Sequence, residues 1–283
     1  MHSVRPRRNF LKLASLLLPA PFLHVESALA ALATPAQATA PAPPSVSDLF
    51  PTQPPELARE MVTVSHFNFK RVQELVDARP SLARAAWDWG FGDWETALGA
   101  ASHMGNRPIA EYLIAKGARP SLFSSAMLGH LEVVKAFIAA QPGVQRIRGP
   151  HSIPLLAHAK AGGAAARPVF DFLQSLGDAG ADPLAPLSDA DAASITGSYT
   201  FGPAMNDQID ITFESYLGHP EPQIVFARKG MMGRPLCHLG DRVFYPVGAS
   251  AVRIRFTQQD SAMLMTIEAP ALVLGVRRSP KSS

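Results

Sequence analysis

The sequence predicts an α+β protein in which a short array of helices precedes an antiparallel β meander. Over residues 56–187, apolar side chains recur at helical spacing in short blocks that glycine and proline separate. Over residues 195–278, apolar and polar residues alternate in short runs separated by Gly, Pro and Asp, which is typical of antiparallel strands. The chain has 283 residues, which is long enough for two domains.

The amino-terminal segment carries a pair of adjacent arginines followed by a short apolar stretch. It resembles the twin-arginine (Tat) signal of bacteria, although Pro6 stands where Ser or Thr usually precedes the pair. The resemblance implies that the Tat export machinery recognises the precursor and that the mature protein is periplasmic or secreted. The residues that carry the signal are Arg7, Arg8, Phe10, Leu11 and Lys12.

Residues 1–30 are predicted to be a removable signal peptide. Small residues allow a signal peptidase to cut after Ala30 or after Ala33. The alternatives are an uncleaved amphipathic anchor or a transmembrane helix. However, Pro19 and Pro21 interrupt the apolar stretch before the roughly 18 apolar residues that spanning requires. We therefore expect no stable membrane anchor.

Charge and cysteine content argue against nucleic-acid binding and against a fold held by disulfides. Without residues 1–30, which hold four basic residues and one acidic residue, 22 of each sign remain. This balance gives no support for nucleic acid as a partner. The single cysteine, Cys237, cannot form an intramolecular disulfide, so the fold must depend on its packed core, and we expect the thiol to be inert in a strand.

Changes in composition set the predicted domain boundaries. Residues 31–55 contain seven prolines among Ala, Thr and Ser, and this composition predicts a linker. The helical array is expected over 56–187 and the β domain over 195–278. Residues 188–194 are expected to be a hinge between them.

Two segments of the helical half, after Gly105 and after Gly129, align without a gap. Together with the segment Trp94–Gly105 and the run GHLEVVK at Gly129–Lys135, they resemble the ankyrin repeat. The resemblance implies stacked helix pairs that form a solenoid and bind another protein. Thr96 is expected to cap a first helix, and Gly105 to adopt the positive φ of the turn between helices.

The array departs from the ankyrin pattern at its centre. The spacing between the two glycines is 24 residues, against about 33 in the family, and this predicts loss of the β-hairpin finger between those units. An unusually aromatic finger, residues Trp87–Trp94, precedes them. Its large side chains either anchor a protein partner or pack the first repeat against the preceding unit. The predicted protein-binding residues are Trp87, Trp89, Phe91 and Trp94.

The β half opens on ITGSYTFG (Ile195–Gly202), which contains the pattern G-x-Y, and continues in short alternating runs. It resembles the small β domains appended to β-lactamase-like hydrolases, which also open on G-x-Y and form a meander of about eight strands similar to part of a lipocalin barrel. The sequence does not decide between an open meander and a closed barrel. If it closes around a cavity, it binds a small apolar ligand. Filling of the interior by its own side chains is the favoured alternative.

The sequence shows no pattern of catalytic or metal-binding residues. Nine histidines are present, but no H-x-x-x-H or H-E-x-x-H spacing accompanies them, so no metal or cofactor is predicted. His130 is expected to bond to the backbone of a neighbouring loop. There is no G-x-S-x-G elbow, and Cys237 and His238 would point to opposite faces of a strand, so no enzyme activity is predicted.

The combined prediction is an exported, non-enzymatic ankyrin-repeat protein that mediates protein–protein interaction in the bacterial periplasm. Its partner is an unidentified protein. The alternative is binding of a small hydrophobic ligand by the β domain, with the repeats as a scaffold.

Overall fold

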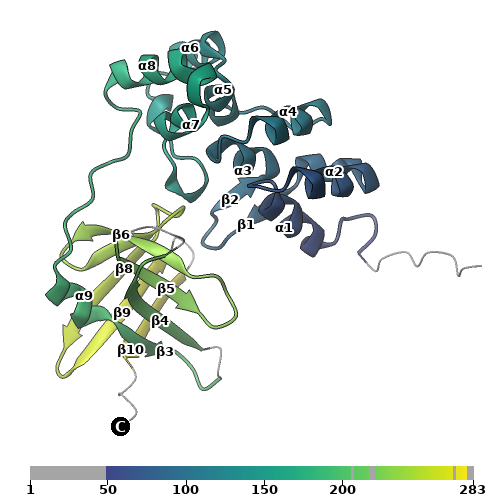
Figure 1. The fold of residues 1–283 in the computed structure, drawn as a ribbon. Coiled ribbons are helices and arrows are strands. Elements are labelled where there is room, and N and C mark those ends of the chain that lie inside the picture. Colours follow the sequence, from purple (N-terminus) through teal and green to yellow (C-terminus); the bar gives the residue numbers. More distant parts are fainter. Residues whose placement is uncertain (1–48, 205–206, 217–220, 270–271, 279–283) are drawn as a thin grey trace, which may run out of the picture. The chain divides into compact units, whose positions relative to one another are not determined.

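A computed structural model describes residues 49–204, 207–216, 221–269 and 272–278 (Figure 1). The predicted signal peptide, its twin-arginine motif and most of the predicted linker lie outside the described residues. The described part of the chain confirms the α+β class, with helices followed by an antiparallel sheet. None of the described helices is long and apolar enough to cross a membrane.

Helices of the first half associate in consecutive pairs, α3 with α4, α5 with α6 and α7 with α8. The first helices of these pairs also contact one another, α3 with α5 and α5 with α7, so the pairs stack. The helices are α1 (Pro55–Val64), α2 (Phe69–Ala78), α3 (Ala97–His103), α4 (Arg107–Ala115), α5 (Leu122–Leu128), α6 (Leu131–Ala140), α7 (Leu155–Ala161) and α8 (Arg167–Leu176).

Local sequence signals explain where these helices begin and end. The Thr96 side chain accepts a hydrogen bond from the backbone N–H of Gly99 and so caps α3, as predicted. Gly105 has the predicted positive φ, +69°, and a Cβ there would lie 2.2 Å from the carbonyl oxygen of Ala161. Only glycine therefore permits this turn to approach α7. Residues 116–121, between α4 and α5, form no strand, as the short repeat spacing predicted.

The aromatic segment forms the predicted hairpin. Strands β1 (Ala86–Asp88) and β2 (Trp94–Thr96) pair antiparallel, with Trp87 opposite Glu95. The two strands contact α1 and α3 respectively. Along β2 the side chains alternate between exposed and buried, so Trp94 faces outward and Glu95 faces the array.

The second half is an antiparallel barrel that β10 closes by pairing with both β9 and β3. The prediction left an open or closed meander, and the structure has the closed form. Its strands are β3 (Gly197–Thr200), β4 (Gln208–Glu214), β5 (Gln223–Arg228), β6 (Arg234–Gly240), β7 (Val243–Pro246), β8 (Arg253–Gln259), β9 (Ala262–Ala269) and β10 (Leu272–Arg278).

Buried side chains fill the described interior of the barrel, with Tyr199, Phe244 and Ile254 fully buried. This packing agrees with the expectation that the barrel is filled by its own residues. Cys237 lies on β6 and is partly buried, and burial raises the pKa of its thiol. A thiol with a raised pKa is a weak nucleophile at neutral pH.

The segment predicted as a hinge is helical. Residues 188–194 form the N-cap and most of α9 (Asp189–Ile195), which Ser188 caps by accepting from the backbone N–H of Asp191. Ala192 and Ile195 belong to the core of the barrel. The irregular connection instead precedes this helix, over residues 177–187.

Candidate metal centre

Four ionisable side chains from four separate elements of the array lie together. His66 follows α1, Glu95 lies on β2, His103 ends α3, and His151 lies in a 3₁₀ turn (Pro150–Ser152) before α7. Each offers one ligand atom, and these atoms all lie within 4.8 Å of one another. The cluster thus joins parts of the chain that are up to 85 positions apart in the sequence.

Glu95 is the centre of the cluster and its side chain is fully buried. Its Oε1 accepts a hydrogen bond from Nε2 of His103 at 2.8 Å, and its Oε2 accepts one from Nε1 of Trp89 at 2.8 Å. Burial alone would raise the pKa of Glu95, but the bonds from His103 and His151 and the positive charge of His151 outweigh it and lower the pKa to about 2. Glu95 is therefore a buried carboxylate at neutral pH.

His66 presents a lone pair to this carboxylate. Its Nδ1 lies 3.1 Å from the carbonyl oxygen of Val62 and 3.0 Å from that of Thr63, and because carbonyls only accept, we assign the proton to Nδ1. Burial is the main cause that lowers the pKa of His66, so the ring is neutral. Its unprotonated Nε2 then faces Oε2 of Glu95 at 3.5 Å, two electron-rich atoms with no proton between them.

His151 is held from behind by a second carboxylate. Its Nδ1 lies 2.8 Å from Oδ2 of Asp93, and its backbone N–H donates to Oδ1 of the same residue at 2.9 Å. Its Nε2 points to Oε2 of Glu95 at 3.3 Å. A carboxylate that binds the far nitrogen of an imidazole is the usual outer shell of a metal-bound histidine.

The backbone of His151 is also unusual. Its φ of +58° lies in the left-handed region, which costs on the order of 1 kcal/mol or more for a residue other than glycine. Burial lowers the pKa of His151, but the bonds to Asp93 and Glu95 outweigh it and raise the pKa to about 9. In the absence of a metal this ring therefore carries a positive charge that balances one of the two carboxylates.

A residue of the barrel completes the surroundings of Asp93. Arg234, on β6, donates from Nη1 to Oδ2 of Asp93 at 2.7 Å and from Nη2 to the carbonyl oxygen of Trp89. Burial raises the pKa of Asp93, but the bonds from His151 and Arg234 outweigh it and hold the pKa below its usual value. The described residues of the array and of the barrel belong to one compact unit.

The residues present fit a transition-metal ion. In tetrahedral zinc coordination with bonds of about 2.1 Å, neighbouring ligand atoms lie about 3.4 Å apart. The separations of 3.3 and 3.5 Å between Oε2 of Glu95 and Nε2 of His151 and His66 match this value. His103 lies on the other oxygen of this carboxylate, with its Nε2 2.8 Å from Oε1, and it would have to exchange this hydrogen bond for a bond to the metal to become a ligand. Three imidazole nitrogens and one carboxylate oxygen suit zinc well.

A separate buried histidine lies beside the cluster. The side chain of His158, on α7, is fully buried, and its Nδ1 lies 3.0 Å from Oγ of Ser102. Burial, together with the charge of His103, lowers the pKa of His158 to about 3. His158 is therefore neutral and part of the core.

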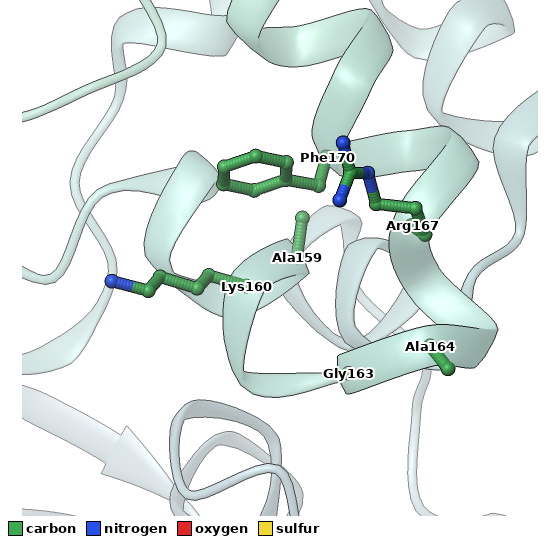
Figure 2. A pocket seen from close by; sticks show the side chains of 6 residues that line it. All are labelled: Ala159, Lys160, Gly163, Ala164, Arg167 and Phe170. Atoms are coloured by element: carbon green, nitrogen blue, oxygen red, sulfur yellow. The ribbon is translucent and has the colours of Figure 1, made fainter.

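A hollow on the array surface is a weaker candidate for a site. Figure 2 shows Arg167 and Phe170 of α8 beside Ala159 and Lys160 of α7 and the small residues Gly163 and Ala164 of the turn between these helices. The guanidinium of Arg167 already donates to Asp171 at 2.7 Å and lies over the ring of Phe170. No buried polar group lines this hollow, so it offers less to a ligand than the histidine cluster does.

The four predicted protein-binding aromatic residues do not form one exposed surface. Trp87 is half-buried against the core of the array, and Trp89 donates its indole N–H to Glu95. Phe91 contacts Phe226 of the barrel, with ring centroids 5.6 Å apart. Trp94 alone among the four is mostly exposed, at 63%.

Sequence reasoning predicted no metal site, and the structure brings three of the nine histidines together around a buried carboxylate. Their spacing in the sequence gives no hint of this arrangement. The one available signal was the pair Asp93 and Glu95 within an otherwise aromatic hairpin, because buried carboxylates require partners.

Fold and site together define an α+β protein with stacked helix pairs, a closed eight-stranded antiparallel barrel and a buried cluster of three histidines and one glutamate. No protein-family model matches the sequence, and no curated protein matches it significantly.

Proposed function

We propose that this protein binds one divalent transition-metal ion, with zinc as the best fit, through Nε2 of His66, His103 and His151 and the carboxylate of Glu95. The observation that carries the proposal is that four ligand atoms lie within 4.8 Å of one another, and that Nε2 of His66, whose Nδ1 faces backbone carbonyls, directs its lone pair at the buried Glu95 carboxylate 3.5 Å away. A cation between them would convert this repulsive pair into two coordinate bonds. Asp93 would orient His151 as a ligand.

The role of the ion would be structural. Four protein ligands complete a tetrahedral shell and leave no position for a substrate, which is typical of structural zinc. The ion would cross-link the turn after α1, the finger, α3 and the turn before α7. Such a cross-link suits a chain with one cysteine, which cannot use an intramolecular disulfide for the same purpose.

The test is metal content under competition. The mature chain, residues 31–283, is stripped with a chelator, incubated with zinc, dialysed, and analysed by elemental mass spectrometry. We expect about one zinc per chain, lost in His66→Ala and in His103→Ala. His130→Ala, which removes an exposed histidine of the same array, is the matched control and should retain the ion. A wild-type chain that holds no zinc, or a His66→Ala chain that holds as much as the wild type, would refute the proposal.

Substitution by cobalt provides a second test of the same site, because it reports the coordination number of the bound ion. Substitution of zinc by Co²⁺ gives an absorption spectrum in the visible region that depends on coordination number, and we expect the intense bands of a four-coordinate ion. Weak bands typical of six-coordinate cobalt would show that Glu95 and the three histidines do not form the closed shell.

A second function, protein binding by the array in the bacterial periplasm, is favoured by Trp94. This side chain is 63% exposed on β2, next to Glu95, so the metal site would fix the strand that presents it. The resemblance of the run at Gly129–Lys135 to the ankyrin repeat supports the same role. The filled interior of the barrel makes the alternative, a small hydrophobic ligand there, the weaker proposal.

Affinity capture from a periplasmic extract tests this second function. The mature chain should retain a protein that Trp94→Ala loses, while both chains keep their zinc and their helix content. Trp89 is unsuitable for this comparison because its indole N–H donates a hydrogen bond to Glu95, so its replacement would also disturb the proposed metal site. Equal capture by wild type and Trp94→Ala would count against the finger as the binding surface.

A further inference from the structure

We infer that Arg234 of the barrel is a positioning residue of the metal centre, and that metal binding and docking of the barrel on the finger are therefore coupled. The inference rests on the proposed metal site. It goes beyond that site because Arg234 contacts none of the four ligands. It acts on the two groups, Asp93 and Trp89, that hold His151 and Glu95 in place.

The guanidinium of Arg234 is enclosed and its partners are fixed. The residue is 7% exposed. Its Nη1 donates to Oδ2 of Asp93 at 2.7 Å and to the carbonyl oxygen of Val247 at 2.6 Å, while Nη2 donates to the carbonyl oxygen of Trp89. A buried arginine that loses an acceptor leaves an unpaired charge, so these bonds hold the barrel to the finger strongly.

Each finger contact of Arg234 continues to a metal ligand. Asp93 binds Nδ1 and the backbone N–H of His151, so the carboxylate that Arg234 fixes sets the direction of that ring. Trp89 donates its indole N–H to Oε2 of Glu95, so the position of its backbone sets the direction of that carboxylate. Asp93 lies between the guanidinium and His151. Arg234 and Asp93 thus present a neutral pair, which limits repulsion between the arginine and a metal ion.

A second contact from the barrel encloses the same carboxylate. Gly248 has a φ of +86°, and a Cβ at this position would lie 2.1 Å from Cγ of Asp93. The backbone N–H of Gly248 donates to Oγ of Ser152, the neighbour of His151, at 2.8 Å. Two separate segments of the barrel, at Arg234 and at Gly248, therefore contact Asp93, and the second also binds the turn that carries His151.

Coupling between the two events follows from linkage. If docking of Arg234 orders the ligands and raises the affinity for metal by some factor, bound metal must strengthen docking by the same factor. Loss of a group that orients a metal ligand costs typically 10–100-fold in affinity. We expect a loss on the order of tenfold for Arg234→Met, since Arg234 acts through Asp93 and Trp89.

Zinc affinity, measured by competition with a chromophoric chelator, tests the positioning role. Wild type, Arg234→Met and Gly248→Ala are compared as mature chains, and both variants should bind zinc about tenfold more weakly than wild type. Gly248→Ala leaves every residue of the array and Arg234 itself intact, so it serves if Arg234→Met fails to fold. Arg242→Met is the matched control, because Arg242 forms a half-exposed pair with Asp191 within the barrel domain, and it should bind zinc as wild type does.

Proteolysis tests the reciprocal effect. The connection over residues 177–187 includes Leu184, which is half-exposed, and it should be cut faster when the barrel undocks. Zinc should slow cleavage of the wild-type chain by proteinase K, which requires no zinc, and should slow cleavage of Arg234→Met much less. Unchanged zinc affinity in both variants, with cleavage that zinc does not alter, would overturn the coupling and leave the metal site intact. Absence of zinc from the wild-type chain would instead refute the metal site itself.

Discussion

Replacement of Glu95 by glutamine should destabilise the protein even without metal. The side chain is fully buried and accepts hydrogen bonds from His103 and Trp89, and its pKa is lowered from 4.5 to about 2. Since each pKa unit corresponds to about 1.4 kcal/mol, the carboxylate contributes on the order of 3 kcal/mol to folding at neutral pH. Glu95→Gln should lower the free energy of unfolding at pH 7 by about this amount, because glutamine lacks the charge.

The pH dependence of this effect has a defined sign. Because the pKa of Glu95 is depressed in the fold, its contribution is complete above the unfolded value of 4.5 and declines as the pH falls from there towards about 2. The difference between wild type and Glu95→Gln should therefore be roughly half as large at pH 3.5 as at pH 7.

Urea unfolding followed by circular dichroism, in the presence of a chelator, measures both values. Glu132→Gln is the control, since Glu132 forms an exposed pair with Lys135 on α6, and it should leave the free energy of unfolding unchanged. A Glu95→Gln chain destabilised by less than about 1 kcal/mol at pH 7 would show that the bonds to Glu95 do not stabilise its charge.

Three further predictions concern protons and export. Zinc affinity should fall as the pH is lowered from 8 to 6, because the imidazole ligands must be unprotonated; titration calorimetry that finds a constant affinity would contradict the ligand set. The pKa of His158 is lowered from 6.5 to about 3, so between these pH values the unfolded chain binds a proton at His158 and the folded chain does not. The free energy of unfolding should therefore decrease as the pH is lowered from 6.5 to 3, by up to about 1.4 kcal/mol per pH unit. Urea titrations should show a shallower dependence in His158→Gln. Replacement of Arg7 and Arg8 by lysine should leave the precursor in the cytoplasm, as cell fractionation would show; undiminished export would refute the twin-arginine signal.

Local patterns predicted much of the fold because each depends on neighbours in sequence. Alternation placed strands over Gln208–Glu214 and other runs of the β half, and the cap at Thr96 and the turn at Gly105 follow from short-range geometry. The helix at Asp189–Ile195 was missed because acidic and small residues in a proline-flanked segment favour a linker. Its stability comes from burial of Ala192 and Ile195 against the barrel, which is a long-range contact. The ankyrin resemblance and the signal peptide stay predictions.

The metal centre could not be predicted for the same physical reason. Its ligands lie at positions 66, 95, 103 and 151, and only the stacking of helix pairs brings them within reach of one another. The positive φ at His151 does not fall on a glycine, which is the residue that usually signals such a backbone conformation in a sequence. Trp89 was predicted to anchor a protein partner, and that role stays a prediction. In the structure its indole N–H donates to Glu95, which makes it a neighbour of the proposed metal site.

Closure of the barrel by β10 has a consequence for the order of events in the cell. Pairing of β10 with β3 and β9 must await synthesis of this strand, long after the array has emerged from the ribosome. Until then β3 and β9 present unpaired edges, which invite aggregation. The closed barrel that carries Arg234 and Gly248 is complete only at that point, so we expect these residues to enclose Asp93 after the array has folded. If the predicted twin-arginine signal directs export, the protein folds before transport, and the metal would then be inserted and enclosed in the cytoplasm.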